Sequence, residues 1–150
     1  MDRDRLVRRA LWASVPFNLG GALLFAFPES LGRLADLPTP APPVYTAPLA
    51  FLIALFAGTY AWLARQPRID RPLVVFAALG KSGFFVVTFG LWALGEASTQ
   101  GMVGASGDLV LAAIFAWWLL AEPAASAASA GPDVAQRSAP APESAARPRR

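Results

Sequence analysis

The sequence predicts an all-α integral membrane protein, a four-helix bundle with up-down-up-down connectivity and both termini in the cytoplasm. Three observations lead to this fold class. Hydrophobic residues make up 55% of the 150 residues, which is high for a soluble domain. They gather in four stretches, each close to the ~20 residues that cross ~30 Å of hydrocarbon. The loops between the stretches are short, and short loops join neighbouring antiparallel helices.

Four membrane spans are therefore expected. They cover residues 10–27, 46–64, 73–95 and 102–121. The first span follows a basic segment, as the apolar region of a signal peptide does. However, it is long for that role, and Leu24–Pro28 contains no small-x-small cleavage site, so we interpret it as a retained span.

The segments outside the spans differ in composition. Residues 1–9 form a basic cytoplasmic N-terminus. In the first outer loop we expect a short helical turn over Ser30–Leu37, followed by a proline run that favours polyproline II. Residues 122–150 are rich in Ala, Ser and Pro and have few large side chains. Such a segment cannot bury enough apolar surface to fold, which predicts a disordered cytoplasmic tail.

Arginine placement predicts the orientation in the membrane. Every arginine except Arg33 lies in the N-terminal segment, in the loop between the second and third spans, or in the tail. The positive-inside rule puts these three segments in the cytoplasm. Within the loop, Arg65, Arg68 and Arg71 flank the spans and are expected to contact anionic lipid head groups. The net charge of +3 therefore indicates membrane topology and lipid contact, and no nucleic acid partner is expected.

Two residue types are absent from the sequence, and their absence excludes whole classes of chemistry. The chain has no cysteine and no histidine. Thiol and disulfide redox chemistry is therefore excluded. So are His-ligated haem, zinc sites and proton transfer by imidazole. No metal site, cofactor or catalytic residue is assigned.

Two charges lie inside the predicted spans, and they are the best clue to function. Lys81 is the only lysine of the chain, and Asp108 lies in the next span. A charge at that depth costs about 3 kcal/mol or more, so it is retained only with a partner or a function. Helical spacing puts Thr88 on the face of Lys81, together with Ala77 and Ala78. Because small residues permit close helix approach, this face is expected to point into the bundle.

Asn18 in the first span and Tyr60 in the second complete the expected intramembrane polar site of Lys81, Asp108, Asn18, Tyr60 and Thr88. At a rise of ~1.5 Å per residue, Asn18 and Lys81 lie about 13 Å from the cytoplasmic boundary and Asp108 about 20 Å. The lysine stem covers roughly 6 Å of this difference, so the depths allow an ion pair without requiring one. The two charges either hold two helices together or form a proton- or ligand-binding site.

Several short motifs together resemble a known family. They are Asn18 with Gly21, Gly58-x-Tyr60, Arg71-Pro72-Leu73, Gly80-Lys81 and Gly107-Asp108-Leu109. The pattern resembles a group of small, uncharacterised bacterial four-helix inner-membrane proteins related to the DoxX-like set. The resemblance covers about Pro16–Leu120 and implies a multi-pass protein of the bacterial inner (plasma) membrane. It implies no established activity, and the absence of cysteine does not fit the oxidoreductase-associated members.

Three functions remain open. The first is binding of a small or lipophilic ligand, or relay of a proton, at the polar site around Lys81 and Asp108. The second is a structural or accessory role in a membrane complex, in which the same charges specify helix pairing. The third is a membrane lipid-modifying enzyme with Asp108 or Tyr60 as acid or base, which ranks last because histidine, an acidic cluster and metal-ligand spacing are all missing. The expected partners are membrane lipids and either a membrane protein or a second copy of the chain.

Overall fold

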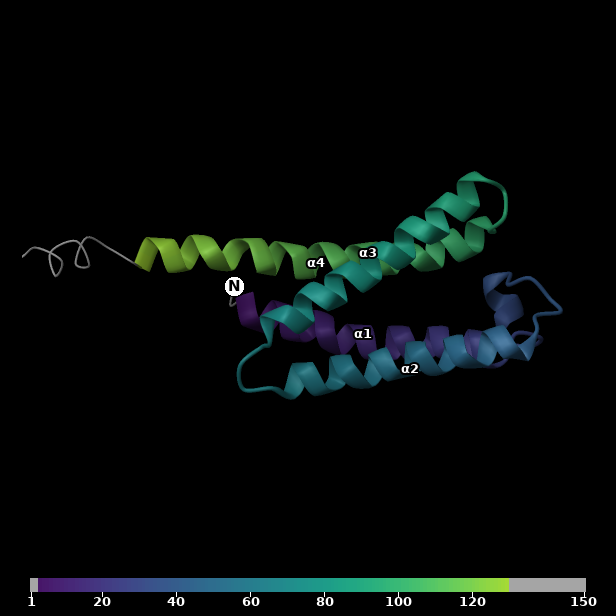
Figure 1. The fold of residues 1–150 in the computed structure, drawn as a ribbon, viewed down its shortest axis with the longest axis horizontal. Coiled ribbons are helices and arrows are strands. Elements are labelled where there is room, and N and C mark those ends of the chain that lie inside the picture. Colours follow the sequence, from purple (N-terminus) through teal and green to yellow (C-terminus); the bar gives the residue numbers. More distant parts are fainter. Residues whose placement is uncertain (1–2, 130–150) are drawn as a thin grey trace, which may run out of the picture. The chain divides into compact units, whose positions relative to one another are not determined.

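The fold is all-helical over residues 3–129, the part of the chain that this computed structural model describes (Figure 1). Four α-helices and one short 3-10 helix follow one another, and no strand occurs in this range. In chain order they are α1 (Arg3–Ala26), η1 (Gly32–Ala35), α2 (Pro43–Arg65), α3 (Arg71–Ala93) and α4 (Thr99–Ser129). The predicted all-α class is confirmed, and η1 lies within the segment for which a helical turn was expected.

Three of the described helices are long and apolar enough to cross a membrane, over Pro43–Arg65, Arg71–Ala93 and Thr99–Ala121. Large apolar side chains on all three are exposed, among them Phe51, Leu79 and Val110. Such surfaces fit a hydrocarbon solvent, in which apolar groups need no burial. Three of the four expected spans are thus supported by length and composition.

The fourth expected span, residues 10–27, falls within α1, which is not among these three helices. The difference has a local cause. The helix begins at Arg3 and includes the charged N-terminal segment. The apolar sequence that follows is interrupted by the polar residues Ser14 and Asn18 and by Pro16, although the helix itself is continuous. The charged N-terminal segment and most of the expected first span are therefore one continuous helix.

At the other end of the described residues, α4 extends past the expected end at Ala121 to Ser129. Half of the added residues are alanine, which has the highest helix propensity, and this favours regular structure where the sequence predicted none. The chain divides into two compact units, Met1–Leu119 and Leu120–Arg150, and all contacts discussed below lie within the first. The tail prediction for residues 130–150 lies outside the described residues.

Local signals account for the helix boundaries. Proline occupies the first turn of both α2 and α3, where its fixed φ suits a helix start. The Asp70 carboxylate caps α3 by accepting the Leu73 N–H at 3.1 Å. At the other end, Gly95 adopts φ +78°, and the Glu96 N–H bonds back to the Leu91 carbonyl at 2.8 Å. This Schellman arrangement ends α3 sharply and starts the turn into α4.

The apolar core of the first unit joins the first half of α1, the last turns of α2, the first turns of α3 and the middle of α4. Its fully buried large side chains are Val7, Leu11, Leu63, Val74 and Phe115. Aromatic contacts also join these helices. Phe56 of α2 stacks on Phe76 of α3 with ring centroids 5.6 Å apart, and the Tyr60 ring of α2 lies 6.3 Å from that of Phe115 on α4. This core ends about one turn before Lys81 on α3, so the polar residues lie at its edge.

Candidate functional site

The site is built around one buried ammonium group on α3. Lys81 is only 3% exposed, and Ala77 and Ala78, one turn earlier, are buried on the same side of the helix. These two small side chains bring the neighbouring helices within reach of the lysine. The predicted inward face of the third span is therefore confirmed for Lys81.

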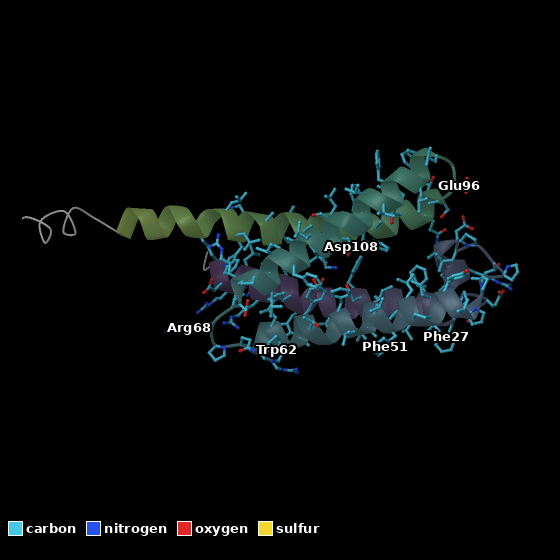
Figure 2. The ribbon with its side chains drawn as sticks, viewed as in Figure 1. Phe27, Phe51, Trp62, Arg68, Glu96 and Asp108 are labelled. Carbon is cyan, nitrogen blue, oxygen red and sulfur yellow. The ribbon has the colours of Figure 1, made fainter. Side chains whose placement is uncertain are left out.

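Lys81 forms a direct ion pair with Asp108 on α4. The Nζ atom donates to Asp108 Oδ1 at 2.6 Å and to Asn18 Oδ1 of α1 at 3.1 Å. Asp108 is also buried, at 8% exposure, and lies between Arg68 at one end of the helices and Glu96 at the other (Figure 2). A buried ion pair is tolerated when further hydrogen bonds satisfy its members, and Asn18 provides one. From the sequence, the difference in depth between Lys81 and Asp108 allowed an ion pair without requiring one. In the structure the lysine stem spans that difference.

Two aromatic rings complete the surroundings of the ammonium group. Lys81 Nζ lies 4.9 Å from the ring centroid of Phe17 and 5.3 Å from that of Tyr60. Both distances are within the ~6 Å at which a ring face attracts a cation. All four helices thus contribute to one group: Phe17 and Asn18 from α1, and one residue each from α2, α3 and α4.

The position of Phe17 depends on a close approach to α4. A Cβ added at Gly107 would lie 2.5 Å from Phe17 Cε2, so any larger residue there would force this ring to shift. Gly107 directly precedes Asp108, and Phe17 directly precedes Asn18. The glycine therefore lets α1 present its amide and its ring together to Lys81. The sequence did not identify Phe17. Nothing in it distinguishes a phenylalanine that lies beside a charge from the many others on apolar helix faces.

Hydrogen-bonding capacity remains at the site. Among the described residues, no hydrogen bond is made by Asp108 Oδ2, by the Asn18 side-chain amide nitrogen or by the Tyr60 hydroxyl. Tyr60 is only 4% exposed. In the same part of the chain no fully buried side-chain nitrogen or oxygen lacks a partner, so these three groups retain some accessible surface. One acceptor and two kinds of donor at the site therefore have no partner among the described residues.

Thr88 is the predicted site residue that does not join the others. It lies seven residues beyond Lys81 on α3, about 10 Å along the helix axis. It is half-buried, and within the described ranges no hydrogen bond connects it to the ion pair. The remaining four predicted residues, Lys81, Asp108, Asn18 and Tyr60, are brought together. No group of three His, Cys, Asp or Glu side chains among the described residues has metal-binding geometry.

The predicted lipid head-group residues differ in their surroundings. Arg65 and Arg68 are exposed, and the Arg65 guanidinium lies 5.0 Å over the Trp12 ring. Arg71 is partly buried and donates to the Leu119 carbonyl at 2.7 Å. That carbonyl accepts no bond from position 123 of the continuing helix, because Pro123 has no N–H. Arg71 therefore substitutes for a missing bond of α4.

A further arginine, which the sequence did not single out, closes the end of α2. Arg8 donates to the carbonyls of Ala64, Gln66 and Pro67 at 2.8, 2.6 and 2.9 Å. The last carbonyls of a helix have no intrahelical partner and carry the negative end of the helix dipole. Arg8 thus joins α1 to the end of α2 and the loop after it.

Comparisons with protein-family models, with curated proteins and with solved structures find no match for this chain. The resemblance to the DoxX-like set remains a prediction. The interpretation of the site therefore rests on its own geometry.

Proposed function

We propose that the protein is a multi-pass protein of the bacterial inner membrane that binds a small or lipophilic molecule, or relays a proton, at the Lys81–Asp108 pair. The proposal includes four spans in up-down-up-down order with both termini in the cytoplasm. Two contacts between elements favour this order. Arg8, near the start of α1, reaches the loop after α2, and Gln100, at the start of α4, donates to the Leu34 carbonyl of η1.

One observation carries the functional part of the proposal, the unused capacity beside a buried charge pair. A purely structural pair is best stabilised when all its groups are satisfied. Here Asp108 Oδ2, the Asn18 amide nitrogen and the Tyr60 hydroxyl have no partner among the described residues and retain accessible surface. A suitable molecule would have a polar group that bonds to these atoms and an apolar body that suits the apolar side chains around them. A proton could move along the same groups, because carboxylate and hydroxyl oxygens both exchange protons.

The test needs a variant that removes both charges together, so that no orphaned charge remains. Lys81→Met/Asp108→Leu is that variant, and Thr88→Val, on the same helix but away from the pair, is the matched control. Each protein is purified, its bound lipophilic molecules are extracted and identified by mass spectrometry, and a second sample is reconstituted into liposomes containing a pH-sensitive dye. We expect the wild type and Thr88→Val to retain a specific molecule or conduct protons, and the double variant to do neither.

A structural or accessory role is the second candidate, and the tightness of the pair favours it. The 2.6 Å contact and the 3% exposure of Lys81 are also what a helix-pairing device requires. The same experiment separates the two. Wild type and double variant that behave alike in both assays would overturn the binding and relay proposal and leave the accessory role. In that case the double variant should lose a membrane-protein partner that the wild type retains.

A further inference from the structure

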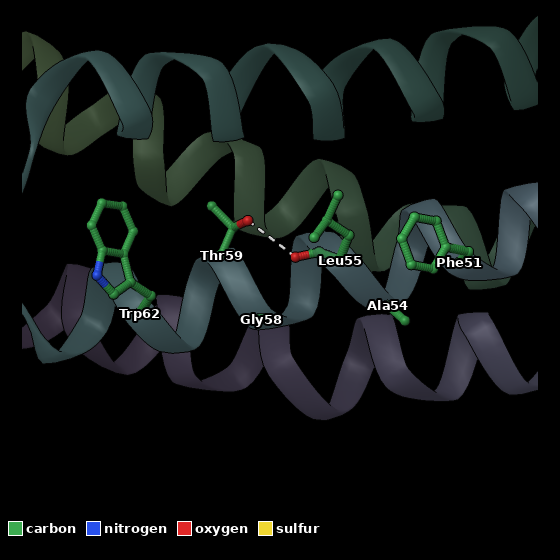
Figure 3. A pocket seen from close by; sticks show the side chains of 6 residues that line it. All are labelled: Phe51, Ala54, Leu55, Gly58, Thr59 and Trp62. Atoms are coloured by element: carbon green, nitrogen blue, oxygen red, sulfur yellow. Dashed lines mark hydrogen bonds between the residues drawn. The ribbon is translucent and has the colours of Figure 1, made fainter.

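A groove runs along the exposed face of α2, away from the ion pair. It has a volume of about 530 Å³ and is lined by Phe51, Ala54, Leu55, Gly58, Thr59 and Trp62, all from this helix (Figure 3). Phe51, Leu55 and Trp62 are each more than half exposed and form its sides, whereas Gly58 and Ala54 leave its floor low. A Cβ added at Gly58 would meet no atom within 4 Å, so packing inside the bundle does not require this glycine.

The groove offers an apolar surface. Two of its side chains carry a polar group. Thr59 donates its hydroxyl to the Leu55 carbonyl at 3.0 Å, the bond drawn in Figure 3, and Trp62 has an indole N–H. That bond satisfies the hydroxyl within the helix, so the Trp62 N–H is the one side-chain polar group of the lining without a hydrogen bond among the described residues. From Phe51 to Trp62 the groove extends about 16 Å along the axis, at a rise of ~1.5 Å per residue. This is about half of the ~30 Å hydrocarbon thickness, the depth of one leaflet.

A positive charge stands at one end of this groove. At about 100° per residue, Arg65 points within roughly 20° of the direction of Gly58, one turn beyond Trp62. It is exposed, and the Trp12 ring of α1 holds its guanidinium at 5.0 Å. Among the described residues the Arg65 side chain makes no hydrogen bond and no ion pair. The groove therefore ends in a cation with open hydrogen-bond donors.

We propose that this face of α2 binds an anionic phospholipid, with one acyl chain in the groove and the phosphate on Arg65. The length of the groove matches an acyl chain of one leaflet, and a guanidinium pairs with phosphate through parallel N–H donors. The Ala54–Gly58 spacing would also suit a helix from a second copy. In a two-fold dimer through this face, however, each Arg65 would meet the Arg65 of the other copy. Charge therefore favours the lipid. The inference needs α2 in a bilayer but does not depend on the ion pair.

The experiment measures lipid retention by native mass spectrometry. The full chain is reconstituted in nanodiscs of phosphatidylcholine with an equal part of phosphatidylglycerol, and released into the gas phase. Arg65→Gln removes the charge, and Gly58→Leu fills the groove without a clash inside the bundle. Two matched controls change the same residue types elsewhere: Arg9→Gln on α1, and Gly83→Leu, an exposed glycine of α3 with open space around it.

We expect the wild type and both controls to retain one phosphatidylglycerol. Arg65→Gln should reduce retention about tenfold, the value of one charge-assisted hydrogen-bonding group, and Gly58→Leu should do so for both lipids. Equal retention of the two lipids by the wild type would overturn the proposal, as would retention unchanged in both groove variants. Release of a dimer that Gly58→Leu abolishes would also overturn it and identify a second copy as the occupant. A chain that fails to enter nanodiscs would overturn this inference and the proposed membrane function together, whereas normal lipid binding with an inactive ion pair would separate them.

Discussion

Cationic side chains hold the helices together in two regions of this molecule, but they use different partners. In the middle of the helices, Lys81 is paired with the carboxylate of Asp108 at 2.6 Å. At the end where α2 meets α3, Arg8 donates to three backbone carbonyls and Arg65 lies over the Trp12 ring. Lys81 is almost fully buried, whereas Arg65 is exposed.

The difference follows from what the solvent can supply at each depth. In hydrocarbon neither water nor phosphate is available, so a cation needs an anion from the protein itself. At the membrane interface, water and lipid phosphates solvate a guanidinium, so partial charges of carbonyls and rings are sufficient partners. Removal of one partner should therefore be costly in the middle of the helices and mild at their end.

The largest expected effect comes from separating the central pair. Lys81→Met leaves a buried carboxylate, and Asp108→Leu leaves a buried ammonium. We expect each to lower the free energy of unfolding by about 3 kcal/mol or more, because an orphaned charge is the costly state. The double variant should recover most of that loss, since it buries no charge. Thermal unfolding in detergent, followed by circular dichroism, measures all four proteins.

Asp108→Asn sharpens this prediction. It keeps an acceptor for Lys81 Nζ but removes the negative charge, so its stability should fall between wild type and Asp108→Leu. Single variants as stable as the wild type would contradict the comparison. They would mean that water reaches the middle of the helices, and that the pair is a hydrated site with no part in holding the helices together.

A smaller effect is expected at the basic end, from the contact of Arg71 with α4. Arg71→Met removes the donor to the Leu119 carbonyl, and Pro123 cannot replace that donor because it has no backbone N–H. The loss should be about 1.5 kcal/mol, the value of a hydrogen bond to a charged group. In a Pro123→Ala background an N–H is restored four residues after Leu119, and the same arginine substitution should cost less. Urea or thermal unfolding of the four proteins gives the coupling energy, and equal costs in both backgrounds would exclude this role for Pro123.

The sequence predicted much of this architecture because its signals are local. Each of the four apolar stretches is a local signal, and a helix formed over each of them. The boundary signals found in the structure, proline and aspartate at helix starts and glycine after α3, were not used in the prediction, although they too act within a few residues. The face of Lys81 was also predictable, from small residues one turn away. Contacts that join distant segments were not. The Arg8 bonds to residues 64–67 and the position of Phe17 against Gly107 depend on how helices pack, which periodicity does not encode.

Thr88 illustrates the same limit and gives the smallest expected effect. Helical periodicity correctly puts it near the face of Lys81, but periodicity says nothing of depth, and two turns carry it about 10 Å from the pair. Thr88→Val conserves the shape, and with no hydrogen bond to the site it should change stability by no more than about 0.5 kcal/mol. Asn18→Leu, which removes an acceptor 3.1 Å from Lys81 Nζ, should cost clearly more in the same unfolding assay. If the two substitutions cost the same, contact with the ammonium would not be what distinguishes the central region, and Thr88 would belong to the site after all.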